Sequence, residues 1–189
     1  MNIVIVGQSR SGKSMLANLI CKSIKGYSKI SLDYLVMTFK KHFGDLNLEY
    51  YKEKDNLFYH FLETYFDNCI YKDNSNGLYY VLEGADIPKD CILRFKNKPN
   101  TLIIYLGKSS ISADDFFEEI RKYEKNLSTG GWTKKLDDAT LHLWCSSWIK
   151  KSKRNKCFCA ENDILYFDTS VNQQMVLENI LKLIENHKL

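Results

Sequence analysis

Residues 7–14 read Gly-Gln-Ser-Arg-Ser-Gly-Lys-Ser, and no other feature constrains the fold of this chain as strongly. The pattern G-x-x-x-x-G-K-S is typical of a loop whose backbone N–H groups surround phosphate oxygens, because glycine leaves open the space that a side chain would fill. The lysine of such a loop reaches the outer phosphates, and the last hydroxyl can bind Mg²⁺. The residues expected to contact a nucleotide are Gly7, Gln8, Ser9, Arg10, Ser11, Gly12, Lys13, Ser14 and Met15.

The segments on either side of the loop predict a strand before it and a helix after it. Residues 2–6 are a short, mostly β-branched apolar run, which is typical of a buried parallel strand. Apolar residues then recur at helical spacing over residues 15–20, so a helix is expected to begin near Gly12. Strand, glycine loop and helix together are the context that this motif requires. The alternative is a tight strand-to-helix turn that contains Gly-Lys-Ser by coincidence.

Five short apolar runs predict the strands of one sheet. Helical sequence lies between most of them, which indicates a parallel α/β sheet with helices on both faces. Ser170 is expected to cap the last helix. The predicted strands are residues 2–6, 28–32, 78–82, 101–106 and 164–167.

Length and composition favour one domain over residues 1–189. The net charge of +4 suits an anionic small molecule at least as well as nucleic acid. The six cysteines lack zinc-site spacing and are expected to be reduced and packed. The first predicted strand begins at residue 2, so we expect no signal peptide, and no apolar run is long enough to cross a bilayer. We therefore expect a cytoplasmic protein without a membrane partner, as a monomer or a homodimer.

Two connections are longer than a simple crossover between strands. Residues 34–77 are rich in aromatic side chains, most of which keep helical spacing and are expected to pack. Their tip, from Lys40 to Asp55, is both polar and aromatic and suits a cover over a substrate. Residues 107–163 predict two helices, Asp114 to Leu127 and Asp137 to about Lys151, joined by a segment with Gly130 and Gly131 that could act as a hinge.

Acidic residues follow three of the five predicted strands, at the sheet edge where chemistry collects. Glu83 ends the third strand and is followed by Gly84, so it is expected to hold Mg²⁺ through water or to position a nucleophile. Asp33 follows the second strand and could accept the proton of an acceptor hydroxyl. The alternatives are a solvent-facing or capping acid for Glu83 and an N-cap for Asp33. Asp168 is expected mainly to form a turn and cap a helix.

A phosphoryl-transfer site also needs cations over the phosphates. Arg121 and Arg154 fall in the 107–163 segment, and Arg10 lies within the loop itself. Each of them taken alone is more typical of a surface residue, so the prediction is that some member of this set closes over the phosphates. The basic run at residues 150–156 is either a nucleic-acid patch or, as we favour, the solvated end of a helix.

The loop at the N-terminus, the Ile-Ser-Leu-Asp33 and Leu-Glu83-Gly84 strand ends, and the insertion between strands four and five resemble P-loop small-molecule kinases. This nucleoside-monophosphate-kinase-like superfamily includes adenylate, shikimate, gluconate and zeta-toxin-like kinases. The resemblance implies a three-layer α/β/α fold with five parallel strands in order 2-3-1-4-5, and ATP and Mg²⁺ as cofactors. It makes Lys13 the phosphate clamp, Ser14 the Mg²⁺ ligand, Asp33 the acceptor-orienting base and Glu83 the second acid.

The chain departs from this family in its arginines. Arg121 is the one arginine of the predicted helix from Asp114 to Leu127, and residues 34–77 contain no arginine, which favours an alcohol acceptor with little negative charge. The implied activity is transfer of the γ-phosphate of ATP to a hydroxyl or phosphate of a small metabolite, nucleoside or nucleotide. Two alternatives remain open: a regulatory module that binds and slowly hydrolyses nucleotide, and a nucleic-acid end kinase that uses residues 150–156.

Overall fold

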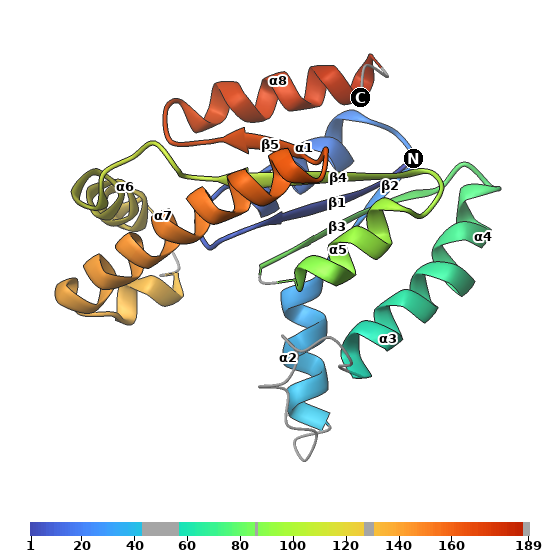
Figure 1. Ribbon diagram of the computed structural model, residues 1–189, viewed down its shortest axis with the longest axis horizontal. Helices are drawn as coiled ribbons and strands as arrows, with labels where there is room; N and C mark the ends of the chain where they lie inside the picture. The colour runs from blue at the N-terminus through green and yellow to red at the C-terminus, as the bar shows by residue number, and fades with distance from the viewer. Residues whose placement is uncertain (43–56, 86, 127–130, 187–189) are drawn as a thin grey trace.

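The computed structural model describes residues 1–42, 57–85, 87–126 and 131–186. Its centre is a parallel sheet with the strand order β2-β3-β1-β4-β5, which confirms the predicted α/β fold (Figure 1). No described helix is long and apolar enough to cross a membrane. The strands are β1 (Asn2–Gly7), β2 (Tyr27–Ser31), β3 (Tyr79–Gly84), β4 (Thr101–Gly107) and β5 (Leu165–Asp168).

Alternating residues of β1 supply the hydrophobic cores on the two faces of the sheet. Ile3 and Ile5 pack with α1 (Lys13–Ser23) and α8 (Gln173–Glu185). Val4 and Val6 pack instead with α5 (Lys89–Lys96) and α7 (Asp138–Glu161). Successive side chains of a strand point to opposite faces, so a central strand that is apolar throughout requires helices on both sides. Figure 1 shows α1 and α8 on one side of the sheet and α5 and α7 on the other.

A third cluster lies away from the sheet. It joins α6 (Ala113–Lys125) to the first half of α7, and the short 3-10 helix η3 (Trp132–Lys135) lies between them in sequence. We call residues 113–125 and 132–149 the α6–α7 unit. Its buried hydrophobic residues are Phe116, Ile120, Leu141, Cys145 and Ile149.

The segment between β2 and β3 is helical where the structure describes it. It contains α2 (Leu32–His42), α3 (Leu57–Tyr65), the π-helix η2 (Phe66–Ile70) and α4 (Tyr71–Asn74). Leu62 and Phe66 are buried, and the Phe66 ring centroid lies 4.9 Å from that of Phe95 on α5. The apolar residues of α3 and η2 therefore extend the sheet core. Most of the predicted substrate cover, from Lys40 to Asp55, lies outside the described residues.

Two predicted helix boundaries are wrong. The helix expected to end near Lys151 continues to Glu161, so the basic run lies inside α7 and not at its end. No glycine or proline interrupts this stretch, and Phe158 packs on the sheet, which extends the buried stripe of the helix. At the last helix, Asn172 and not Ser170 is the N-cap, since its side chain accepts a hydrogen bond from the Met175 N–H at 3.2 Å.

Cysteine reactivity tests this packing. Burial raises the pKa of Cys91 and Cys159 to about 12 and that of Cys145 to about 11, whereas Cys157 is exposed. At pH 8 a thiol of pKa 12 is ionised to roughly one part in ten thousand. We expect iodoacetamide at pH 8 to alkylate Cys157 first and the three buried thiols only after denaturation, as measured by peptide mass spectrometry. Equal rates for Cys157 and Cys159 would contradict the packing of α7 on the sheet.

Candidate active site

Two glycines shape the loop between β1 and α1. Gly7 has φ +154°, and a Cβ there would lie 2.0 Å from the carbonyl oxygen of Leu106, so only glycine lets the loop leave β1 beside β4. Gly12, with φ +93°, precedes the first residue of α1. The first turn of α1 therefore directs unpaired N–H groups and the positive end of the helix dipole toward the loop. This arrangement is a ready anion site.

Lys13 is enclosed by the loop that precedes it. Its side chain is buried, and Nζ donates a 2.8 Å hydrogen bond to the carbonyl oxygen of Gln8. Burial lowers the pKa of Lys13, and the carboxylates of Asp33 and Glu83 act in the opposite direction. Lys13, Asp33 and Glu83, which the sequence predicted from three separate segments, are thus close enough to interact electrostatically.

Glu83 and Ser14 form a hydroxyl–carboxylate pair. Glu83 is only 3% exposed, and its Oε2 accepts a 3.0 Å hydrogen bond from the Ser14 hydroxyl. Lys29 Nζ lies 3.9 Å from the other carboxylate oxygen. Oxygen ligands of these two kinds are those that Mg²⁺ prefers. Within the described ranges, no three His, Cys, Asp or Glu side chains gather at a point where they could hold a metal by themselves.

Asp33 lies at the end of β2, in the first turn of α2. Its carboxylate is exposed, and Oδ1 accepts a hydrogen bond from the Ala85 N–H at 3.4 Å. The helix already begins at Leu32, so Asp33 is not its N-cap. This carboxylate is therefore exposed at the carboxyl edge of the sheet and close to the segment that follows Glu83.

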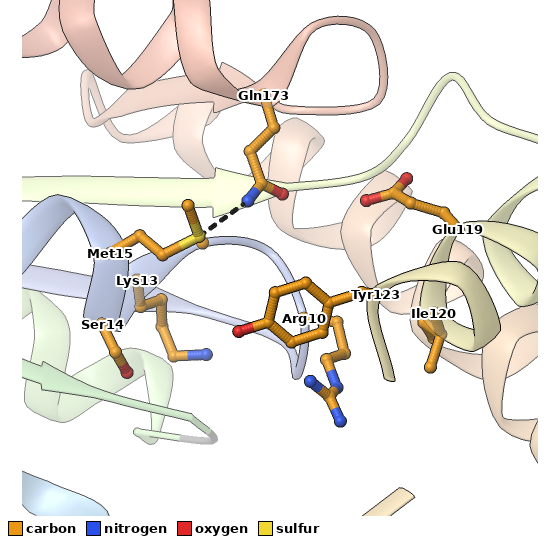
Figure 2. Close-up of a pocket in the computed structure, with 9 residues that line it drawn as sticks. Arg10, Lys13, Ser14, Met15, Glu119, Ile120, Tyr123 and Gln173 are labelled. Atoms are coloured by element: carbon orange, nitrogen blue, oxygen red, sulfur yellow. Dashed lines mark hydrogen bonds between the residues drawn. The ribbon is translucent and has the colours of Figure 1, made fainter. Parts of the chain in front are cut away.

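A pocket of about 310 Å³ opens beside the loop. Figure 2 shows the loop and α1 on one side of it and α6 on the other. Gln173, the first residue of α8, approaches Met15 with its Nε2 3.2 Å from the thioether sulfur. The thioether of Met15 and the ring of Tyr123 offer surfaces that suit a flat heterocycle. The lining residues are Arg10, Gly12, Lys13, Ser14, Met15, Glu119, Ile120, Tyr123 and Gln173.

Of the three predicted arginines, Arg10 lines this pocket and the other two do not. Arg121 is held within the α6–α7 unit by its hydrogen bonds to Asp138 and Glu124 and to the carbonyl oxygen of Leu136. Arg154 is exposed on α7. The structure therefore brings together Lys13, Ser14, Glu83 and Arg10 around the loop, with Asp33 at the neighbouring strand end.

A second pocket, of about 210 Å³, lies at the carboxyl ends of β1 and β4 on the opposite face from α1. Gly7 of the phosphate loop contributes to it, as do the beginning of α5 and the middle of α7. Two lysines and one amide line its polar side. Its lining residues are Val6, Gly7, Ile87, Pro88, Lys89, Tyr105, Lys151 and Asn155.

Sequence reasoning missed Tyr123 and Gln173, which line the first pocket, and Glu124, which contacts Arg10 of that pocket. Glu124 pairs with Arg10 at 3.3 Å, although it is distant in sequence. The one available signal was its spacing of three residues from Arg121 on a predicted helix, which suits an ion pair. Nothing in the local sequence of Tyr123 or Gln173 distinguishes either from a surface residue.

The residues present fit a polyphosphate. Both polar atoms of the Gln8 side chain and the Nε of Arg10 are buried without a hydrogen-bond partner among the described residues. Buried polar groups of this kind carry a desolvation cost that a bound anion or ordered water relieves. The Gln8 Nε2 and the Arg10 Nε can donate to phosphate oxygens, whereas the Gln8 Oε1 can only accept a hydrogen bond. Together with the loop, the Lys13 ammonium and the Ser14–Glu83 pair, these two donors are the groups expected to hold nucleotide phosphates and Mg²⁺.

The fold is that of shikimate kinases. A shikimate kinase from Bacteroides thetaiotaomicron matches with a TM-score of 0.60 and 16% sequence identity, over 100% of this chain and 99% of that chain. A shikimate kinase from Acinetobacter baumannii, in complex with shikimate, matches with a TM-score of 0.50 and 12% identity, over 100% and 94% of the two chains. No protein-family model and no curated protein matches the sequence. At these identities the similarity establishes the fold alone.

Removal of the Lys13 charge tests the phosphate site. Lys13→Met keeps the length of the side chain and deletes one charged donor, so nucleotide should bind about 10- to 100-fold more weakly. Isothermal titration with ATP and Mg²⁺ measures the effect. Lys22→Ala, at an exposed lysine on the same helix, is the matched control and should bind as the wild type does. Unchanged affinity in Lys13→Met would exclude the loop as the nucleotide site.

Proposed function

We propose that this protein is an ATP-dependent phosphotransferase that moves the γ-phosphate to a hydroxyl or phosphate group of a small molecule. The observation that carries the proposal is the convergence of Lys13, the Ser14–Glu83 pair and Asp33 at one edge of the sheet. A loop that only binds phosphate does not need a second, exposed carboxylate at the neighbouring strand end, whereas transfer to an alcohol does. The shared fold with shikimate kinases supports the same reaction class.

Each group has a distinct role in this proposal. Lys13 and the N–H groups at the start of α1 neutralise the charge of the outer phosphates. Ser14 and Glu83 hold Mg²⁺, directly or through water, and the ion supplies further positive charge when it is bound. Asp33 accepts a hydrogen bond from the acceptor hydroxyl and orients its oxygen for attack. The base of the nucleotide lies in the first pocket, between Met15 and Tyr123.

The second pocket is the site that we propose for the acceptor. Asp33 is hydrogen-bonded to Ala85, two residues before Ile87, which lines that pocket. The pocket also shares Gly7 with the phosphate loop. Because Lys89 and Lys151 line it and no carboxylate of the described residues does, it favours an acceptor with a negative group. Residues 34–77 contain no arginine that could bind such a group, and in this location Lys89 and Lys151 supply the positive charge instead.

One observation favours a nucleic-acid end as the second candidate acceptor. Lys150, Lys153, Arg154 and Lys156 are all exposed on α7. A row of exposed cations attracts a phosphate backbone, and such binding weakens steeply with salt. The regulatory alternative depends on the aromatic tip of residues 40–60 as a partner surface, and this tip lies mostly outside the described residues.

Asp33→Asn separates a kinase from a nucleotide-binding module. Loss of the base should lower the transfer rate about 10²- to 10⁴-fold, because general base catalysis typically contributes that much. Affinity for ADP, measured by titration calorimetry, should stay close to that of the wild type. Asp163→Asn, at an exposed acid before β5, is the matched control. Wild-type turnover in Asp33→Asn would disprove the assigned role of this carboxylate.

A screen for ADP release identifies the acceptor. The panel contains shikimate, nucleosides, nucleoside monophosphates, carboxylated and phosphorylated alcohols, and an oligonucleotide with a free 5′-hydroxyl. With an anionic acceptor, Lys89→Gln should raise the KM for that acceptor about tenfold and leave the KM for ATP unchanged, since one charged contact is lost. Lys13→Met reports contamination if it still releases ADP. Equal acceptor KM values for Lys89→Gln and wild type would place the acceptor elsewhere.

A further inference from the structure

Arg10 connects the phosphate loop to the α6–α7 unit. Its Nη2 alone makes both contacts, a 3.3 Å ion pair with Glu124 Oε1 and a hydrogen bond to the Thr133 hydroxyl. The Nε–H group is buried and has no partner among the described residues. Arg10 lines the first pocket together with Lys13, so one side chain contacts both that pocket and the α6–α7 unit.

Glu124 has a second cationic partner besides Arg10. It is 3% exposed, and its Oε2 accepts a 3.1 Å hydrogen bond from Arg121. Arg121 also donates to Asp138 at 2.6 Å and to the carbonyl oxygen of Leu136 at 2.9 Å. Arg121 is therefore held in place within the α6–α7 unit, beside Glu124. Arg10 can share its charge with an anion without leaving Glu124 as an unpaired buried carboxylate.

The position of the Arg10 guanidinium is set by close packing. Arg10 has φ +64°, a left-handed conformation that is uncommon for a residue other than glycine. Its guanidinium carbon lies 5.4 Å from the centroid of the Tyr123 ring. On another side, a Cβ at Gly131 would lie 2.6 Å from Nη2. Gly131 has φ −63°, which any residue can adopt, so a Cβ there would displace the end of the Arg10 side chain without straining the backbone.

We propose that Arg10 binds the outer phosphates of the nucleotide while it keeps its contact with Glu124, and that Glu124 is a positioning residue which couples the phosphate loop to the α6–α7 unit. The proposal rests on the proposed function only in requiring a nucleotide in the loop. Coupling between two sites is reciprocal. Phosphates that reach Arg10 therefore stabilise the contact between the loop and the unit, and that contact in turn raises the affinity for nucleotides with several phosphates.

The tryptophans provide a readout that does not depend on catalysis. All three tryptophans of the chain, Trp132, Trp144 and Trp148, lie in the α6–α7 unit, and their rings pack on one another. Intrinsic fluorescence therefore reports on the unit, while titration calorimetry reports nucleotide affinity. In the wild type we expect ATP to change the fluorescence and AMP, with a single phosphate, to change it much less.

Two variants act on the contact by different means. Glu124→Gln removes the charge that positions Arg10, and Gly131→Ala displaces the guanidinium while both charges remain. Each should lower the ATP affinity about tenfold with little effect on AMP, as expected for the loss of one charge-assisted contact. Each should also abolish the ATP-induced fluorescence change. Glu118→Gln, at an exposed glutamate on the same helix, is the control and should behave as the wild type does.

The outcomes separate the two proposals. If Gly131→Ala and Glu124→Gln keep the wild-type ratio of ATP to AMP affinity and the wild-type fluorescence change, the coupling is overturned and the proposed function stands. If Glu124 has a purely structural role, Glu124→Gln will lower the melting temperature and leave the ratio of ATP to AMP affinity unchanged. That result also overturns the coupling. A wild-type protein that binds no ATP overturns both proposals. If Glu124→Gln does not fold, Gly131→Ala decides alone, because its Cβ meets the end of a flexible side chain.

Discussion

The pairing of β1 with β3 and β4 determines where the groups of the candidate site lie. The register with β3 places Glu83 beside Ile5 and Gly84 beside Val6, so the carboxylate lies next to the loop that leaves β1. On the other side Gly7 pairs with Leu106, and their close approach excludes any side chain at the first glycine of the loop. The carboxyl edge of the sheet thus collects a cation, a hydroxyl and two carboxylates from segments that are distant in sequence.

Buried charges attach the α6–α7 unit to this edge at two points. Lys108, 1% exposed, follows β4 and lies 2.8 Å from the Glu119 carboxylate, and it also donates to the carbonyl oxygen of Thr169. One turn further along α6, Glu124 meets Arg10 from the phosphate loop. Glu119 is 43% exposed, so solvent screens its pair with Lys108, whereas Glu124 is 3% exposed and its pair with Arg10 is the better shielded of the two. Both contacts favour one placement of α6 over the pocket.

The sequence predicted the sheet and the centre of the site because their signals are local. A β-branched run followed by a glycine loop and a helix specifies β1, Lys13 and α1, and an acid at a strand end is visible at Glu83. The contacts of Arg10 could not be predicted, because Glu124 and Thr133 lie more than a hundred residues away and no local pattern records which cation they meet. The end of α7 was misplaced because the burial of Phe158, which continues the helix, is a tertiary contact.

The unbroken length of α7 has a mechanical consequence. Its 24 residues form one rod of roughly 36 Å, in contact with the sheet core through Phe158 and with the third cluster through Leu141. Those two residues are about 25 Å apart along the axis, so a tilt of about 5° at the sheet end displaces the far end by about 2 Å. Asn155, which lines the second pocket, lies near the end of α7 that packs on the sheet. A small tilt of α7 on binding of a molecule in the second pocket would therefore become a larger displacement at the other end of the helix, where α7 packs against α6.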